Sequence, residues 1–184
     1  NQLQILLCEL AAYLHNKNME INVWDRIIAF EGRMHEFIKA AYDYQDNTFH
    51  SHPGYYIDYF EMRLAQLQVL HNLHYEIKKI RKMPKQALVI ADYIMYMADY
   101  VVEMNIPDQQ IEKLEEISEQ MKQEELPKTR EEFEGRALLY HILMDLEEFL
   151  VYKKRFVNGL DEKKLRIYWK QEMEQKDSAN ELQK

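Results

Sequence analysis

The 184-residue sequence predicts an all-α protein, built as an antiparallel bundle of about six to seven helices. Apolar residues recur three and four positions apart along nearly the whole chain, which is the period of an amphipathic helix. β-Branched residues are sparse, and no Asn-Gly or Asp-Gly turn joins two alternating apolar runs. We therefore expect a single helical-bundle domain over residues 1–176 and a frayed tail at 177–184.

The first three helices are expected over residues 1–17, 25–45 and 53–81. Pro53 suits the first turn of the third helix, because its missing N–H has no partner there in any helix. The apolar stripe of the first helix consists of Leu3, Leu6, Leu7, Leu10 and Leu14. The face of the third helix consists of Tyr56, Tyr59, Phe60, Arg63, Leu64, Leu67, Leu70, His71, His74 and Ile77.

The fourth and fifth helices are expected to open at Pro84 and Pro107 and to end near residues 103 and 124. Residues 88–102 are nearly apolar and are broken by Asp92 and Asp99. Fifteen residues with two carboxylates are too short and too polar to cross a bilayer. The segment therefore predicts a buried bundle helix with one polar edge.

The sixth helix is expected from Thr129 to about residue 157. Thr129 is a suitable N-cap, and Glu132 three residues later completes a capping box. Gly135 inside this helix costs about 1 kcal/mol relative to alanine, which a close approach by another helix would justify. Gly159 has the position of a C′ glycine, and Asp161 is expected to cap a seventh helix ending near residue 176.

The composition excludes several classes of protein. A net charge of −8 argues against nonspecific nucleic-acid binding, which needs a basic surface. A single cysteine, Cys8, cannot form an internal disulfide or a cysteine zinc site, which favours a reducing compartment. The chain starts with Asn-Gln and not with Met, so we expect it to be part of a longer polypeptide. No signal peptide is recognised in the sequence.

Charge is divided between two regions. Residues 108–125 contain seven acidic residues and two lysines, whereas residues 153–170 contain seven basic residues and two acidic ones. The first interpretation is two solvated helix faces that complement each other. The alternative is that the basic region faces anionic lipid while the acidic helix faces the cytosol.

Catalytic motifs are missing from the sequence. The four glycines are far apart, so no phosphate-binding loop can form, and none of the three serines lies in a nucleophile elbow. No histidine follows a glutamate by three residues, as di-iron bundles require. His71 and His74 lie one turn apart but have no recurring partner pair. We therefore expect no enzyme activity, no catalytic residue, no metal and no cofactor.

Six tyrosines offer a candidate binding pocket: Tyr55, Tyr56, Tyr59, Tyr93, Tyr96 and Tyr100. They could line a pocket for an aromatic acid, with Arg63 pairing the carboxylate. The alternative is that they fill the edge of an amphipathic core and keep their hydroxyls in water.

Two blocks resemble the C-terminal domain of the bacterial aromatic acid exporter family. The first is YYIDYFEMRLAQLQVLHNL at 55–73, with Met62, Arg63 and Gln66 at its centre. The second is LPKTREEFEGRALLYHILMDLEEFLVYKKRF at 126–156. A Pro-Lys-Gln-Ala helix start at 84–87 lies between them, so the family-like core covers 55–156.

This resemblance implies a transmembrane region earlier in the same polypeptide and a domain on the cytoplasmic side of the cell membrane. The expected function is a non-catalytic accessory domain for assembly or regulation. The alternative is a ligand-sensing bundle that binds an aromatic acid or another small molecule. Self-association and contact with anionic lipid are further expectations. The candidate motif or interface residues are Tyr55, Arg63, Gln66, Arg130, Glu132, Phe133, Glu134 and Arg136. Of these, the four charged residues between 130 and 136 are expected to form a fixed ionic cluster against Arg63 or another helix.

Overall fold

The computed structural model describes residues 2–16, 23–47, 53–161, 164, 165, 167 and 169. Within these residues the chain forms six α-helices and no strand, which confirms the all-α prediction. The helices are α1 (Gln2–His15), α2 (Val23–Asn47), α3 (Pro53–Lys79), α4 (Ala87–Asp99), α5 (Asp108–Lys122) and α6 (Arg130–Asn158).

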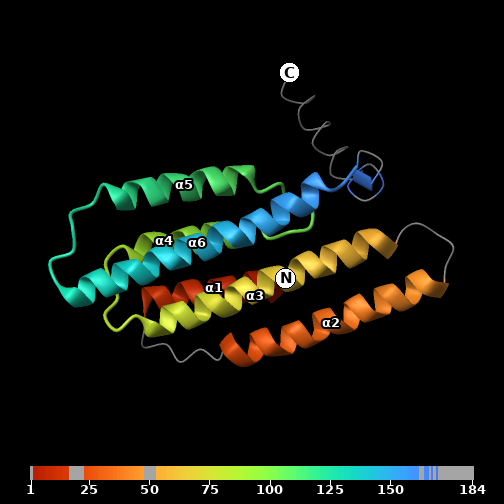
Figure 1. Cartoon of the computed structure of the whole chain (residues 1–184), viewed down its shortest axis with the longest axis horizontal. Coiled ribbons are helices and arrows are strands. Elements are labelled where there is room, and N and C mark those ends of the chain that lie inside the picture. The colour runs from red at the N-terminus through yellow and green to blue at the C-terminus, as the bar shows by residue number, and fades with distance from the viewer. Residues whose placement is uncertain are drawn as a thin grey trace, which may run out of the picture.

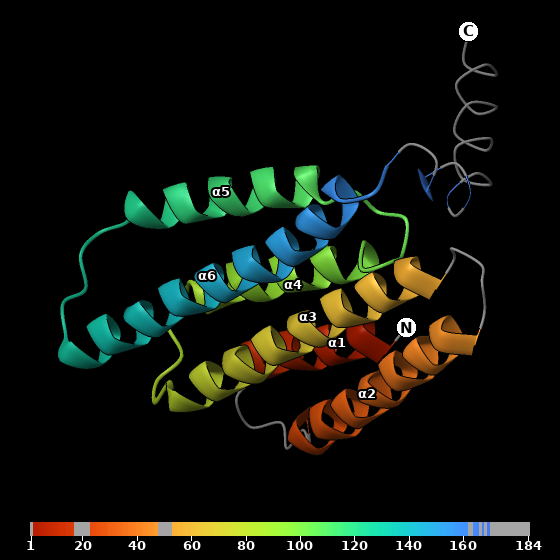
Figure 2. The same ribbon diagram turned by 45° about the vertical axis from the view of Figure 1, so that its right-hand side comes forward.

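The helices pack as an antiparallel bundle (Figure 1). The principal pairs are α2 with α3, α3 with α6, and α1 with α4. Helices α2 and α5 lie at opposite edges in both views, and α6 crosses between α5 and α3 (Figure 2). The start of α3, the end of α6 and the connection between α4 and α5 therefore meet at one end of the bundle.

The core confirms the apolar stripe expected for the first helix but only part of the face expected for the third helix. Tyr56 of that face is 44% exposed, whereas Tyr55 and Leu73 lie outside it and are buried. The predicted leucines of α1 are all buried, and they pack with buried residues of α3, α4 and α6. Members of this main cluster without measurable exposure include Leu7, Leu14, Leu70, Leu73, Ile77, Ile90, Ile94, Leu139 and Leu146. A smaller cluster lies at the end of the bundle where α3 begins and α6 ends, and consists of Tyr55, Met62, Phe156, Val157, Leu160 and Trp169.

Helix α4 is shorter than expected at both ends. Pro84 does not open it; instead the Pro84 carbonyl accepts the Ala87 N–H at 3.0 Å in a turn before the helix. At the other end, Tyr100 and Val101 donate to carbonyls three residues back, which is a tightened final turn. Residues 100–107 consequently form a connection to α5 that contains turns and a bend, instead of a helical end.

Only one face of α4 is buried, so the expected buried bundle helix is half correct. Leu88, Met95 and Val102 are 47%, 45% and 40% exposed and alternate with the exposed Asp92 and Asp99 along one stripe. Among the described residues, no helix combines the length and apolarity needed to cross a membrane.

Both ends of α6 differ in detail from the expected caps. Thr129 Oγ1 accepts the Glu132 N–H at 3.1 Å, as expected. The reciprocal bond reaches one residue earlier than in a capping box, because the N–H of Lys128 donates to Glu132 Oε2 at 2.9 Å. Gly159 is the C-cap of α6, one position before the expected C′, and its φ of −79° is right-handed.

The expected seventh helix lies mostly outside the described residues. Its predicted cap is present, because Asp161 Oδ1 accepts the Lys164 N–H at 2.7 Å and the Asp161 carbonyl accepts the Leu165 N–H. The remaining course to residue 176 and the predicted tail at 177–184 lie outside the described residues.

Gly135 does have a close neighbour, but that neighbour is the connection between α3 and α4 and not a helix. A Cβ atom on Gly135 would lie 2.9 Å from Pro84 Cγ and 3.3 Å from the Lys82 carbonyl oxygen. The missing side chain therefore lets α6 approach this connection.

We expect Gly135→Ala to lower the free energy of unfolding by about 1 kcal/mol in urea denaturation. Overpacking against Pro84 and the Lys82 backbone costs about 1–3 kcal/mol, and the gain in helix propensity offsets about 1 kcal/mol of it. Gly32→Ala in α2 is the matched control, because nothing lies within 4 Å of its Cβ position. That control should stabilise the protein, and equal stabilisation by Gly135→Ala would contradict the close approach.

Candidate functional site

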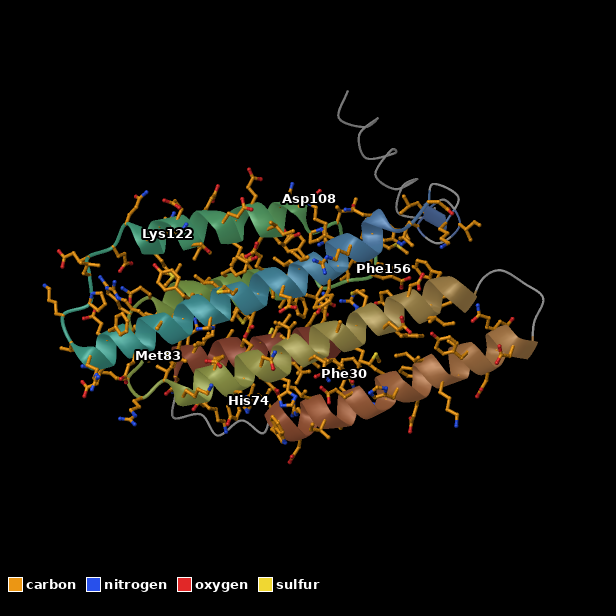
Figure 3. All side chains as sticks on the ribbon, in the orientation of Figure 1. Phe30, His74, Met83, Asp108, Lys122 and Phe156 are labelled. Atoms are coloured by element: carbon orange, nitrogen blue, oxygen red, sulfur yellow. The ribbon has the colours of Figure 1, made fainter. Side chains whose placement is uncertain are left out.

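Two buried cations distinguish the end of the bundle where α3 begins and α6 ends. Arg63 of α3 and Lys153 of α6 are each only 4% exposed. Their helices place them there through local spacing: Tyr59 and Gln66 share a face with Arg63, and Phe149 and Phe156 share a face with Lys153. In Figure 3, Phe156 marks this end of α6 and Asp108 the adjacent start of α5.

Arg63 is held by three groups. Its Nη1 donates to Gln66 Oε1 at 2.8 Å, and its Nε donates to the Tyr59 hydroxyl at 3.1 Å. The guanidinium carbon lies 5.1 Å from the centre of the Tyr59 ring. Gln66 in turn donates to the main-chain carbonyl of Phe149 at 2.8 Å, which links α3 to α6.

Lys153 points into an aromatic and cationic environment. Its ammonium donates to the main-chain carbonyl of Glu103 and lies 5.3–5.8 Å from the ring centres of Tyr59, Phe156 and Trp169. Burial, and then the neighbouring Arg63 guanidinium, lower the pKa of Lys153 from 10.5 to about 7, while Glu103 acts in the opposite direction. Near neutral pH this side chain therefore changes its charge.

Tyr55 and Trp169 border the site and are hydrogen-bonded to each other. The Tyr55 hydroxyl donates to Glu103 Oε1 at 2.7 Å and accepts the Trp169 indole N–H at 3.1 Å. Burial raises the pKa of Tyr55 well above its ordinary value, so this phenol stays protonated. The α4–α5 connection and residue 169 are thus both fixed to the start of α3.

A small cavity lies beside the two cations and is also lined by residues of the α4–α5 connection. Its volume is about 10 Å³, and its polar lining consists of Arg63, Gln66, Tyr100, Asn105, Gln110 and Lys153. This is close to the room that one water molecule needs. The site can therefore hold one water-sized atom, but not an aromatic ring in its observed form.

The expected ionic cluster at the start of α6 is divided into two parts. Arg136 is buried; it donates to Glu132 Oε1 at 3.1 Å and to the Glu125 carbonyl at 2.6 Å. Arg130 and Glu134 form a separate exposed pair at 3.8 Å. Phe133 is 62% exposed and contributes nothing to either part.

None of these charges lies against Arg63, contrary to one of the two expected arrangements. Arg63 is linked to α6 at Phe149, through Gln66. Phe149 lies about 20 Å along α6 from Arg136, at a rise of about 1.5 Å per residue. The structure therefore brings Tyr55, Arg63 and Gln66 together and places Arg130, Glu132, Phe133, Glu134 and Arg136 near the opposite end of the bundle.

The six candidate tyrosines form two groups instead of one pocket. Tyr55, Tyr56 and Tyr59 stack with one another and with neighbouring phenylalanines. Tyr93, Tyr96 and Tyr100 pack between α4 and α5, where the Tyr93 hydroxyl donates to the Gln110 carbonyl at 2.7 Å. Most of them therefore fill the core and its edge, as the second interpretation expected. The hydroxyls of the buried Tyr55 and Tyr93 bond inside the protein, so the expectation that all six hydroxyls stay in water is wrong.

The two candidate histidines pack around Trp24. The indole ring centre lies 4.3 Å from His71 and 6.1 Å from His74. Within the part of the chain that the structure describes, no group of three potential metal ligands occurs.

The basic region does not present a uniform surface. Lys153, which was expected to face lipid, is buried, and Lys154 forms a 3.0 Å ion pair with Asp108 at the start of the acidic helix. Where it is described, the charge split thus includes an internal contact between the two regions, as the first interpretation held.

Sequence reasoning missed Lys153, Glu103 and Trp169. A signal for Lys153 was present, since it lies seven residues after Leu146 and three after Leu150, both on the buried face of α6. Its charge placed it in a basic run instead. Glu103 contacts Lys153 through its main-chain carbonyl, which no sequence pattern marks.

The fold and site define an all-α bundle domain with a buried pair of cations between two long antiparallel helices. The family model described as "Putative aromatic acid exporter C-terminal domain" matches residues 1–154. The chain therefore belongs to this family, and the resemblance expected from its sequence blocks is confirmed. The family description names an exporter domain and no enzyme.

Two relatives extend this comparison. "Uncharacterized protein YqjA" of Bacillus subtilis (strain 168) is 32% identical over 98 residues, which are 53% of this chain and 30% of that protein. The matched stretch is therefore less than a third of that relative. A "putative membrane protein from Clostridium difficile 630" has a crystal structure with a TM-score of 0.75 and 25% identity, covering 84% of this chain and 92% of that one.

Proposed function

We propose that this chain is a non-catalytic accessory domain of an aromatic acid exporter, on the cytoplasmic side of the membrane. The observation that carries the proposal is the family match over residues 1–154, since the family is described as the C-terminal domain of such an exporter. A C-terminal domain of an exporter is attached to a transmembrane region earlier in the polypeptide. The free thiol Cys8 supports the cytoplasmic side, where thiols stay reduced.

Regulation by a small ligand is a second candidate, and a specific observation favours it. Arg63 lines a cavity, is buried, and keeps Nη2 without a hydrogen-bond partner among the described residues. A passive assembly domain has no need of such a costly group. An assembly role would instead use exposed apolar surface, which Leu88 and Met95 on α4 and Val102 in the α4–α5 connection provide.

We expect a cysteine placed at Leu126 to be reached by reagents only from the cytoplasm. Leu126 lies in the α5–α6 connection and is 85% exposed, so Leu126→Cys presents an accessible thiol. In the full-length protein with Cys8→Ala, a membrane-impermeant maleimide should label inverted membrane vesicles and leave intact cells unlabelled.

The control is the Cys8→Ala protein without the new cysteine, which should remain unlabelled at this domain in both preparations. Labelling of intact cells would place the domain outside and contradict the proposed sidedness. Recovery of the full-length protein in the soluble fraction would contradict attachment to a membrane region.

A further inference from the structure

The buried site between α3 and α6 holds more positive than negative charge at short range. Arg63 and Lys153 both lie beside the Tyr59 ring, at 5.1 and 5.8 Å from its centre. Neither takes part in any of the ion pairs that the described residues form. Glu103 contacts Lys153 through its main-chain carbonyl, and its carboxylate accepts the Tyr55 hydroxyl. With Lys153 protonated, these three side chains carry one net positive charge.

One donor of the Arg63 guanidinium has no hydrogen-bond partner among the described residues, on the side of the site that lacks a negative charge. Arg63 uses Nε and Nη1 for Tyr59 and Gln66, but its Nη2 is buried and has no hydrogen-bond partner among the described residues. A charged donor left unpaired in the interior is costly, and such groups are normally satisfied by water or by an ion.

The cavity limits what that partner can be. About 10 Å³ accommodates one water-sized atom. The Asn105 amide and the Gln110 side chain, bonded to each other at 3.1 Å, add polar lining without adding charge. Tyr100 and Val102 are exposed and also line the cavity, so they form its boundary with the surface.

We propose that Arg63 and Lys153 bind one small anion in this cavity, either a halide ion or the oxygen of a carboxylate inserted from the side of Tyr100. Arg63 Nη2 donates to the anion, and the ammonium of Lys153 contributes the second positive charge. This proposal is independent of the proposed exporter function, and anion binding can be measured on the isolated chain.

The affinity should depend on pH through Lys153. The charged and titratable groups that face its ammonium are Arg63 and Tyr59 on α3 and Glu103 on the α4–α5 connection. Burial and Arg63 lower the pKa of Lys153 to about 7. The charged form is thus abundant at pH 6 and scarce at pH 8, so an anion that requires it should bind about tenfold more tightly at pH 6.

The test is made on the wild-type chain with two probes, sodium bromide and sodium benzoate. Crystals grown with bromide should show an anomalous peak beside Arg63 Nη2, and calorimetric titration should give the pH dependence. Displacement of bromide by benzoate would assign the site to carboxylates, and failure of benzoate to displace it would assign the site to halides. Both results support an anion site. No bromide peak at that position in crystals soaked at pH 6 would overturn it.

Variants separate this site from general effects of salt. Arg63→Met and Lys153→Met should each abolish the bromide response, whereas Lys154→Met should retain it, because Lys154 pairs with Asp108 at the surface. An unchanged response in folded Arg63→Met protein would contradict the proposal. If Arg63→Met fails to fold, the anomalous peak in wild-type crystals still decides.

Discussion

The unfolding free energy of the wild-type protein should rise by about 2 kcal/mol between pH 7 and pH 9, and Lys153→Met should remove most of this rise. Burial and the Arg63 guanidinium lower the pKa of Lys153 from 10.5 to about 7 in the folded protein. In the unfolded chain the ammonium keeps its ordinary pKa, so between these pH values the unfolded state binds more protons. The unfolding free energy therefore rises as the pH increases from 7 to 9, and the same contribution is lost as the pH falls back towards 7.

Urea denaturation at pH 7 and pH 9 measures this difference. Lys154→Met is the matched control and should keep the wild-type rise, because its ammonium is half exposed and pairs with Asp108. The raised pKa of Cys8 acts in the opposite direction near pH 9 and is the same in all three proteins. An equal rise in Lys153→Met would mean that Lys153 is charged and solvated when folded.

The second large effect is expected at Arg136, whose replacement by methionine should lower the unfolding free energy by about 1.5–3 kcal/mol. Its guanidinium donates to the Glu125 carbonyl and to Glu132, and it lies 3.7 Å from Glu124. Glu124 also accepts a bond from the buried Gln86 before α4. One side chain thus ties the α5–α6 connection to both α6 and the start of α4.

Thermal or urea unfolding of Arg130→Met provides the comparison. Arg130 carries the same charge six residues earlier, but its pair with Glu134 is exposed, and such pairs contribute about 0.2–1 kcal/mol. Similar losses in both variants would show that the Arg136 contacts contribute no more than an ordinary solvated pair.

The fold could be predicted because it follows from local pattern. The leucine stripe of α1 and the Thr129 cap of α6 are properties of neighbouring residues, and the structure confirms both. Helix ends were less accurate. Pro84 can open a helix on local grounds, but here its carbonyl closes a turn and its ring packs against Gly135, a contact that the sequence does not reveal.

The site was predicted only in part, for the same reason. Tyr55, Arg63 and Gln66 lie within one helix, so their spacing placed them together. Trp169 reaches Tyr55 across 114 positions of the chain, and only tertiary packing decides that contact. Lys153 was assigned to the surface because lysines are rarely buried without a partner. The single-domain boundary at 176 and the roles of the candidate residues stay predictions.

The proposed role of this domain in a membrane exporter of aromatic acids is tested by measuring efflux. Cells loaded with radiolabelled benzoate would carry either the full-length polypeptide or the same polypeptide without residues 1–184, with equal amounts in the membrane. Benzoate should leave the cells that carry the full-length polypeptide chemically unchanged. Efflux should fall sharply in the cells whose polypeptide lacks residues 1–184. Equal efflux from both, or conversion of benzoate into another compound by the isolated chain, would contradict it.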